Sequence, residues 1–257
     1  MPCLTTIVTT VQAPEHRILA YLKAGARLQS MSQNLIIPDR KTALERLTSF
    51  PPRSNLYEVA EKFGITVLRN GRLNKGWAGQ TLERIAGLST NNFAGRDGAD
   101  FELKSTTLVE RNGVWVPRET IKVTTLNPAR ILDEEFQTSA LWTKLSRLIL
   151  VGCAYPKDNT CEIVRIASVD TVDTQTKDQL ESFWLDVKHT VINGEIAEYK
   201  NLGSSDDLLQ LRPTGTSRDL SLCPITQEYF PSCAFYATKK LIQRFFAVGV
   251  SDLSILY

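Results

Sequence analysis

The spacing of the apolar residues changes at about residue 99, and the change separates two kinds of predicted local structure. Before it, apolar residues recur at helical spacing, and the breaker Pro51-Pro52 divides the predicted helices. Over residues 99–107 (ADFELKSTT) polar and apolar residues alternate as in a strand, and Asn112-Gly113 is a strong hairpin turn signal. Helices, then a mixed sheet, then helices predict an α/β or α+β layer fold.

The same patterns give ranges for the individual elements. Ser54 is the expected N-cap of a helix that Gly64 ends, and Gly87 ends the next helix. The hairpin sheet is expected to continue through residues 119–125. Helices are predicted over residues 14–31, 41–47, 55–63, 76–86, 177–192 and 239–248. The other predicted strands cover residues 115–116, 148–154, 162–167 and 208–211.

Composition is that of an ordinary globular protein. With 42% hydrophobic and 23% charged residues, the 257-residue chain can bury one substantial core, as one domain or as one domain with two lobes. Its apolar runs fall short of the roughly 20 residues that span a bilayer. Residues 1–12 lack the charged and apolar regions of a signal peptide. We therefore expect a soluble, cytoplasmic protein.

The counts of cysteine, histidine and charge argue against several functional classes. The five cysteines are odd in number and form no close C-x-x-C pair, which indicates reduced thiols and argues against a zinc site or a disulfide framework. The two histidines, His16 and His189, are too few for a histidine-rich metal site and make Ser/His/Asp chemistry improbable. A net charge of +2 does not indicate a nucleic-acid partner, because a DNA-binding cleft needs local positive charge.

Residues 96–104 (RDGADFELK) contain the strongest candidate site. Residues two apart on a strand share a face, so Glu102 and Lys104 point the same way and Leu103 points into the opposite layer. A bend at Gly98 can turn the carboxylate of Asp97 toward Glu102. Two carboxylates and an ammonium group then meet at a strand end. Carboxylate oxygens hold Mg²⁺, and a lysine beside the ion can orient or deprotonate water or stabilise the transition state of phosphodiester hydrolysis.

Two other interpretations of this segment stay open. Acid-x-x-x-x-Glu-x-Lys arises often by chance, and alternating charges on a strand are usually a solvated face. Asp100 also competes with Asp97 as the first ligand, although it lies further down the face of Glu102 and Lys104.

Further motifs accompany this segment in a fixed order along the chain. They are residues 74–83 (NKGWAGQTLE), 117–120 (PRET), 144–147 (KLSR) before an apolar strand, 209–213 (LQLRP) and 235–239 (FYATK). Over roughly residues 56–246 these motifs resemble the MutH family, which comprises methyl-directed mismatch-repair nickases and related type II restriction endonucleases. Several motifs in the right order are much more specific than any one of them.

The resemblance implies a restriction-endonuclease-like core in which a mixed β-sheet is flanked by helices, with two lobes around a DNA cleft. It implies a MutH-like endonuclease domain over residues 51–257, with a catalytic lobe over about 51–170 and a DNA-reading lobe over about 171–257. Residues 1–50 are predicted from their own apolar spacing to form a helical N-terminal extension. One or two Mg²⁺ ions are implied, held by Asp97, Glu102 and Glu83. The implied catalytic set is Asp97, Glu102, Lys104, Glu83 and Lys144. The implied DNA-binding residues are Arg212, Thr214, Arg218, Tyr236 and Lys239.

Two of these residues have plain structural alternatives. Glu83 could be an exposed helix acid, and Tyr236 could be a core residue. Arg212 suits DNA because its planar guanidinium matches guanine or phosphate.

The chain also departs from the nickases. They usually carry Arg-Pro-Lys at the recognition loop, whereas this chain has Arg212-Pro213-Thr214, so a basic base-reader is lost and a GATC target is in doubt. The spacing from Asp97 to Glu102 is shorter than in the nickases, and residues 1–50 have no recognised counterpart. These differences favour a restriction enzyme over a repair nickase.

Three hypotheses follow. The first is a type II restriction endonuclease that cuts double-stranded DNA at a short palindrome, either as a homodimer on DNA or one strand after the other. The second is a nickase that needs mismatch-repair partner proteins. The third is a DNA-binding module without catalysis, in which the acids are surface decoration.

Overall fold

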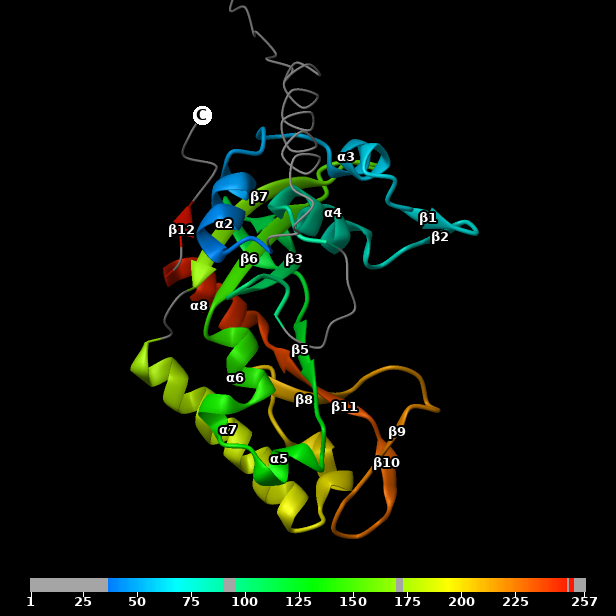
Figure 1. Cartoon of the computed structure of the whole chain (residues 1–257), viewed down its shortest axis with the longest axis vertical. Helices are drawn as coiled ribbons and strands as arrows, with labels where there is room; N and C mark the ends of the chain where they lie inside the picture. The colour runs from blue at the N-terminus through cyan, green and yellow to red at the C-terminus, as the bar shows by residue number, and fades with distance from the viewer. Residues whose placement is uncertain (1–36, 90–95, 170–172, 249, 252–257) are drawn as a thin grey trace, which may run out of the picture.

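The computed structural model describes residues 37–89, 96–169, 173–248 and 250–251, so the helix predicted over residues 14–31 lies outside the described part. Two main β-sheets lie one beyond the other along the molecule, and helices pack around both (Figure 1). The predicted mixed α/β class is confirmed. A curled mixed sheet flanked by helices is consistent with a restriction-endonuclease-like core.

The larger sheet has five strands in the order β12-β7-β6-β3-β4. They are β3 (Glu102–Arg111), β4 (Val114–Pro117), β6 (Leu148–Ala154), β7 (Glu162–Val169) and β12 (Val250–Ser251). β3 and β6 run parallel, whereas the other neighbouring pairs are antiparallel. Every residue of β6 is buried, which explains why its sequence is almost continuously apolar.

Three helices pack against this sheet: α2 (Arg40–Thr48), α3 (Leu56–Lys62) and α4 (Trp77–Ala86). Their apolar side chains share one core with Leu103 of β3 and Ile149 of β6. α4 ends at Gly87, whose φ of 84° is left-handed and favours glycine. Because α2 belongs to this core, residues 40–48 of the predicted extension pack with the elements that follow them.

A two-stranded hairpin precedes α4. β1 (Leu68–Arg69) and β2 (Arg72–Leu73) are antiparallel, and both turn residues have positive φ, 51° at Asn70 and 72° at Gly71. An Asn-Gly pair suits such a turn because both residues tolerate positive φ. The sequence analysis did not predict this hairpin, although its turn signal is the same as that at residues 112–113.

The smaller sheet has three strands in the order β5-β11-β8. These are β5 (Ile121–Thr125), β8 (Leu209–Pro213) and β11 (Cys233–Ala237). One face, with Val123, Leu211 and Phe235, is buried in a second core that includes Trp184 of the long helix α7 (Thr174–Ile192). The other elements are α5 (Arg130–Asp133), η1 (Phe136–Thr138), α6 (Ala140–Leu145), η2 (Ile196–Asn201), β9 (Leu220–Leu222), β10 (Tyr229–Pro231) and α8 (Lys239–Val248).

Two expectations, one about a strand pairing and one about a helix cap, were wrong. Residues 121–125 do not continue the hairpin sheet, because β5 pairs with β11 in the smaller sheet. β4 ends at Pro117, which has no N–H to donate to a further ladder position. Asn55, not Ser54, caps α3, since the Asn55 side chain accepts a hydrogen bond from the Tyr57 amide at 3.2 Å. Asn55 also accepts from the Cys161 amide, which joins α3 to β7.

Other expected boundaries agree closely with the structure. The strand at residues 148–154 and the start of α8 at Lys239 lie where they were predicted. α7 begins three residues earlier than predicted because Asp173 accepts a hydrogen bond from the Thr176 amide and so caps the helix. The four cysteines of the described ranges are free and buried. Among the described helices, none is long and apolar enough to cross a membrane.

Candidate active site

Glu102 is the centre of the candidate site. It is the first residue of β3, and its side chain is fully buried. One carboxylate oxygen, Oε1, accepts a hydrogen bond from the Lys144 ammonium group at 2.8 Å and another from Lys104. The second oxygen, Oε2, is buried and has no hydrogen-bond partner. A buried carboxylate requires compensating charge, and two lysines from different elements provide it.

Asp97 lies beside this pair because the chain bends before β3. Its Oδ2 accepts a hydrogen bond from the Leu103 amide at 2.9 Å and lies 3.9 Å from the Lys104 ammonium nitrogen. The bend depends on Gly98, since a Cβ there would lie 2.0 Å from the ring of Phe101, which is fully buried. The structure thus brings Asp97, Glu102 and Lys104 together, with Lys104 between the two carboxylates.

Glu83, on α4, interacts electrostatically with the same group. Burial raises the pKa of its carboxyl to about 7, because the charged form loses hydration. The negative charges of Asp97 and Glu102 raise the pKa further, while Lys104 opposes them. The charge on Glu83 is therefore coupled to all three residues, as expected if Glu83 faces the site and not open solvent.

Asp100 has a different place. Its two oxygens accept a hydrogen bond from the Arg40 amide at the start of α2 and form an ion pair with Arg147, each at 2.8 Å. These contacts tie α2 to the segment before β6. Asp100 is occupied in holding the fold together, which leaves Asp97 as the acid beside Lys104.

Arg96 fixes the position of the bend, and the sequence analysis did not select it. Its guanidinium donates to the backbone oxygens of Thr143 at 2.9 Å and Asp100 at 3.2 Å, and to the Ser146 hydroxyl at 3.3 Å. Thr143 precedes Lys144 on α6. Arg96 therefore clamps the segment that carries Asp97 to the helix that carries Lys144. The only sequence feature that could have indicated this role is the position of Arg96 directly before Asp97.

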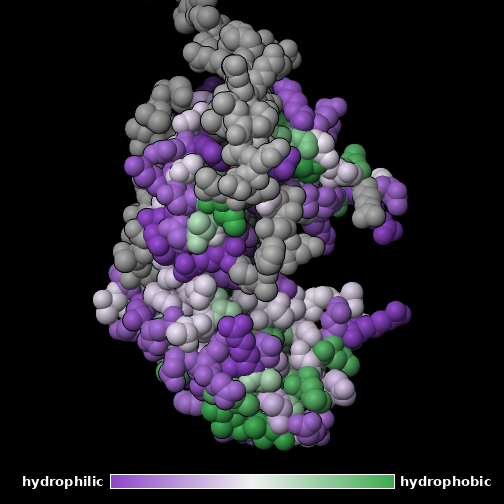
Figure 2. Space-filling view, in the orientation of Figure 1, coloured by the Kyte–Doolittle hydropathy of each residue, from purple (hydrophilic) through white to green (hydrophobic). Residues whose placement is uncertain are grey.

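Lys104 and Lys144 line an open groove of about 910 Å³ that continues along β5 and past Phe235 of β11. The surface of the molecule is also hollowed on the right of Figure 2, between two projections. In Figure 1 these projections are the β1–β2 hairpin and the loop between β8 and β9. The two lysines thus face a concave surface that has room for a large ligand.

The exposed face of the smaller sheet carries part of the predicted DNA-binding set. The guanidinium of Arg212 lies 5.2 Å from the centre of the Tyr236 ring and donates to the Thr120 hydroxyl at 3.0 Å. Tyr236 is partly exposed, so it is not a core residue. Thr214 accepts a hydrogen bond at 2.9 Å from the ammonium group of Lys122 on β5.

Lys122 is a residue that the sequence analysis missed. It pairs with Tyr236 across the β5–β11 ladder, so it shares a face with Tyr236. The alternation of polar Lys122 with apolar Val123 was visible in the sequence. The residues that lie beside Lys122 could not be predicted, because the pairing of its strand was predicted wrongly. Arg218 and Lys239 are exposed, in the loop after β8 and at the first residue of α8, and no described contact joins them to Arg212.

The residues of the cluster have the donor atoms that a metal ion needs, but few of them. Within the described ranges, no three or more His, Cys, Asp or Glu side chains are grouped closely enough to form a ligand set by themselves. The donor chemistry nevertheless suits Mg²⁺, which needs only one or two carboxylates and keeps several waters. Glu102 offers a buried oxygen without a partner, and Asp97 Oδ2 lies 3.9 Å from the ammonium nitrogen of Lys104, which also binds Glu102. Glu102 and Asp97 therefore fit such an ion, with Glu83 near them.

A mixed sheet flanked by helices, with carboxylates and lysines gathered at the start of one strand, is consistent with the class of restriction-endonuclease-like proteins. Residues 89–182 match the family model described as DNA mismatch repair enzyme MutH. The match supports membership of the MutH family over this range and confirms the resemblance predicted from the sequence. The match supports a DNA endonuclease of the MutH or restriction-enzyme type. Among curated proteins, no match to the chain was found.

The matched range divides the predicted site residues. Asp97, Glu102, Lys104 and Lys144 lie inside it, whereas Glu83 and the five DNA-binding residues lie outside. The roles of the individual residues therefore rest on their geometry.

Proposed function

We propose that this protein is a Mg²⁺-dependent, sequence-specific endonuclease that hydrolyses phosphodiester bonds of double-stranded DNA. The observation that carries the proposal is Glu102, a fully buried carboxylate with one oxygen bound by two lysines and the other without a partner. A carboxylate that serves only the fold would be expected to have both oxygens satisfied. The matching family supports a nuclease independently.

Each residue of the cluster has a separate task in this proposal. Glu102 and Asp97 would hold the Mg²⁺ ion, with Glu83 as a further carboxylate. When bound, the ion would supply charge neutralisation at the phosphate and a more acidic water. Lys104, held between Asp97 and Glu102, would orient the attacking water or stabilise charge on the phosphoryl oxygens. Lys144 would keep a second ammonium group near the scissile phosphate.

Sequence reading would take place on the smaller sheet. Arg212, stacked near Tyr236, presents a guanidinium whose planar fork suits guanine or phosphate. Lys122 places an ammonium group beside Thr214. Because the groove is lined by Lys104 and by β5, a bound strand could pass from the reading surface to the catalytic cluster. We propose the predicted lobes, about residues 51–170 and 171–257, as the two sides of this cleft.

A type II restriction role is the first candidate, because Thr214 stands where the nickases usually carry lysine. A chain with one catalytic cluster would cut both strands of a palindrome as a homodimer or in two successive events.

Digestion of a supercoiled plasmid tests the proposal. Wild-type protein with Mg²⁺ should give discrete linear fragments, and sequencing of the fragment ends should give one short site. Lys104→Ala should cut far more slowly than the wild type. Lys157→Ala is the matched control, because Lys157 is exposed and follows β6, at the end of the sheet opposite Glu102. A Lys104→Ala protein that cuts as well as the control would refute the proposed role of the cluster.

A second candidate is a mismatch-repair nickase, which the name of the matching family favours. It predicts nicked circles, not linear DNA, and stimulation by mismatch-repair partner proteins. The same plasmid assay separates the two, since nicked and linear products run differently on a gel. Linear product at every enzyme concentration, without any partner protein, would exclude the nickase.

A further inference from the structure

A second large groove lies away from the catalytic cluster. It is an open groove of about 1390 Å³ between the C-terminal end of α3, the β1–β2 hairpin and the face of α4 that carries Gln80 and Arg84. None of its lining residues lines the groove at Lys104 and Lys144. The groove is therefore a separate feature of the surface.

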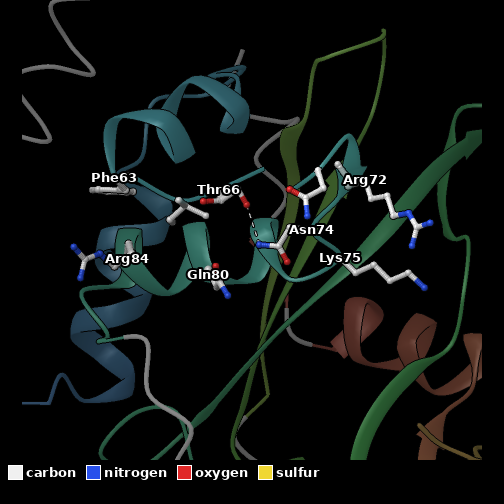
Figure 3. A pocket seen from close by; sticks show the side chains of 11 residues that line it. Phe63, Thr66, Arg72, Asn74, Lys75, Gln80 and Arg84 are labelled. Atoms are coloured by element: carbon white, nitrogen blue, oxygen red, sulfur yellow. Dashed lines mark hydrogen bonds between the residues drawn. The ribbon is translucent and has the colours of Figure 1, made fainter. Parts of the chain in front are cut away.

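All the charged side chains that line this groove are positive. Arg72, Lys75 and Arg84 line it, and no acidic side chain does so among the described residues. Thr66, Asn74 and Gln80 lie between these cations. In Figure 3 the side chains of Arg72 and Lys75 run side by side at one end, and Arg84 lies at the other end near Phe63. The cations are thus spread along the groove instead of converging on one point.

The hairpin side of the groove has a defined conformation. The side chain of Asn74 donates to the Thr66 backbone oxygen at 2.9 Å and accepts from the Gly76 amide at 3.2 Å, which closes the base of the hairpin (Figure 3). The Asn70-Gly71 turn fixes its tip. Arg72 therefore projects from a built element next to Lys75. Preorganised charges bind an anion more tightly than charges that must first be ordered.

α4 connects this groove to the catalytic cluster. The charge on Glu83 is coupled to those of Asp97 and Glu102, while its neighbour Arg84 and the earlier Gln80 line the groove. Successive residues of a helix point about 100° apart, so one helix can present its acid to the metal site and its cation to another surface. A polyanion that leaves the catalytic cluster past α4 would meet this groove next.

We infer that the groove binds backbone phosphates of the DNA substrate outside the cleavage site, an inference that rests on the proposed nuclease function. The volume exceeds the roughly 300–1,000 Å³ of small-molecule pockets. Cations at both ends with neutral polar groups between them match a row of phosphates better than a single anion. Contacts of this kind position a duplex and add affinity without reading sequence.

DNA binding by duplexes of two lengths tests the inference. Both are centred on the cleavage site found by end sequencing. One ends a few base pairs outside the site, and the other extends about one helical turn further on each side. Binding is measured in EDTA at several salt concentrations. The full-length protein is compared with Arg72→Ala and Arg72→Ala/Arg84→Ala. Arg111→Ala is the control, because Arg111 is exposed at the far end of β3 from Glu102.

The wild type and the control should bind the longer duplex more tightly, and the double variant should lose this gain. Its slope of log K against log salt on the long duplex should be shallower by about 1.8, since each lost phosphate contact removes about 0.9. Arg72→Ala, which alters only an exposed side chain, should lose about half of the affinity gain on the longer duplex. Melting curves check that every variant is folded.

Equal length dependence and equal salt slopes in wild type and double variant would overturn the inference. If the groove binds a small anion instead, millimolar inorganic phosphate should stabilise the wild type but not the double variant, and DNA affinity should not depend on duplex length. This result too would overturn the inference. Failure of the proposed function looks different. In that case the wild type cuts no DNA at all, so no cleavage site exists on which to centre the duplexes.

Discussion

The cluster around Glu102 and the exposed face around Arg212 use charge in opposite ways. At Glu102 a carboxylate is buried completely and two lysines compensate it, so each charge depends on the others. At Arg212 the cation is exposed and stacks near Tyr236, and its loss leaves no buried charge unpaired. Removing one partner of a buried pair is costly, whereas an exposed contact contributes little to stability. Substitutions in the cluster around Glu102 should therefore lower the stability of the protein. Substitutions on the face around Arg212 should weaken DNA binding without changing the fold.

The largest expected effect is on catalysis. Lys104→Ala should lower the cleavage rate by about 10²–10³, the usual loss when one preorganised charge is removed from a transition state. Affinity for DNA should change little in comparison, because Lys104 is one of several cations along the groove. Single-turnover cleavage and equilibrium binding separate the two quantities. An affinity loss that accounts for the whole rate loss would make Lys104 a binding residue only.

Arg212→Ala tests the exposed region. DNA affinity should fall by about 1–3 kcal/mol, the range for a bidentate base contact, which corresponds to roughly 5- to 150-fold. The melting temperature should stay close to that of the wild type. Binding is measured in a Lys104→Ala background so that the DNA stays intact. A fall in melting temperature without a fall in affinity would show that Arg212 serves the fold and not DNA binding, which contradicts the comparison between the two regions.

Lys122→Ala should have a smaller effect. Lys122 donates to Thr214 from β5, the strand on the opposite edge of the smaller sheet from β8, so its removal takes away one cation from the reading face. The salt slope of DNA binding should be shallower by about 1 if the contact is with phosphate. If it is with a base, the cleavage site should relax at one position instead. An unchanged slope together with an unchanged site would remove Lys122 from the DNA surface.

The last expected effect concerns the dependence of stability on pH through Glu83. The pKa of its carboxyl is about 7 in the folded protein, against 4.5 as the ordinary value. As pH rises through this window the unfolded chain ionises first, so the folded state loses stability and the loss is complete above pH 7.

Glu83→Gln cannot ionise and should escape this loss. In EDTA its melting temperature should exceed that of the wild type more at pH 8 than at pH 4. The difference is measured by thermal denaturation at the two pH values. Equal differences at both would show that Glu83 is solvated, as in its plain interpretation as an exposed helix acid.

Local patterns predicted much of the fold and of the cluster. The unbroken apolar run of β6, the alternation that places Glu102 and Lys104 on one face, and the C-cap at Gly87 depend on residues close in sequence. Asp97 also belongs to this group, because its contact with the Leu103 amide spans only six residues.

Long-range pairings could not be predicted in the same way. β5 pairs with β11 across more than a hundred residues, and the clamp from Arg96 to Thr143 depends on how α6 packs. Neither leaves a periodic trace in the sequence. Lys122 and Arg96 were missed for this reason, since each acquires its role from a partner that only the folded chain brings near.

Binding of a divalent ion to the cluster is the central claim, and titration of the protein with Mn²⁺, with free Mn²⁺ followed by electron paramagnetic resonance, tests it most directly. Glu102→Gln keeps the shape of the side chain and removes its charge. Asp158→Asn is the matched control, since Asp158 is exposed in the turn after β6. We predict that the wild type and Asp158→Asn bind Mn²⁺ alike and that Glu102→Gln loses at least tenfold in affinity. Equal affinity in all three proteins would contradict the assignment of Glu102 as a metal ligand.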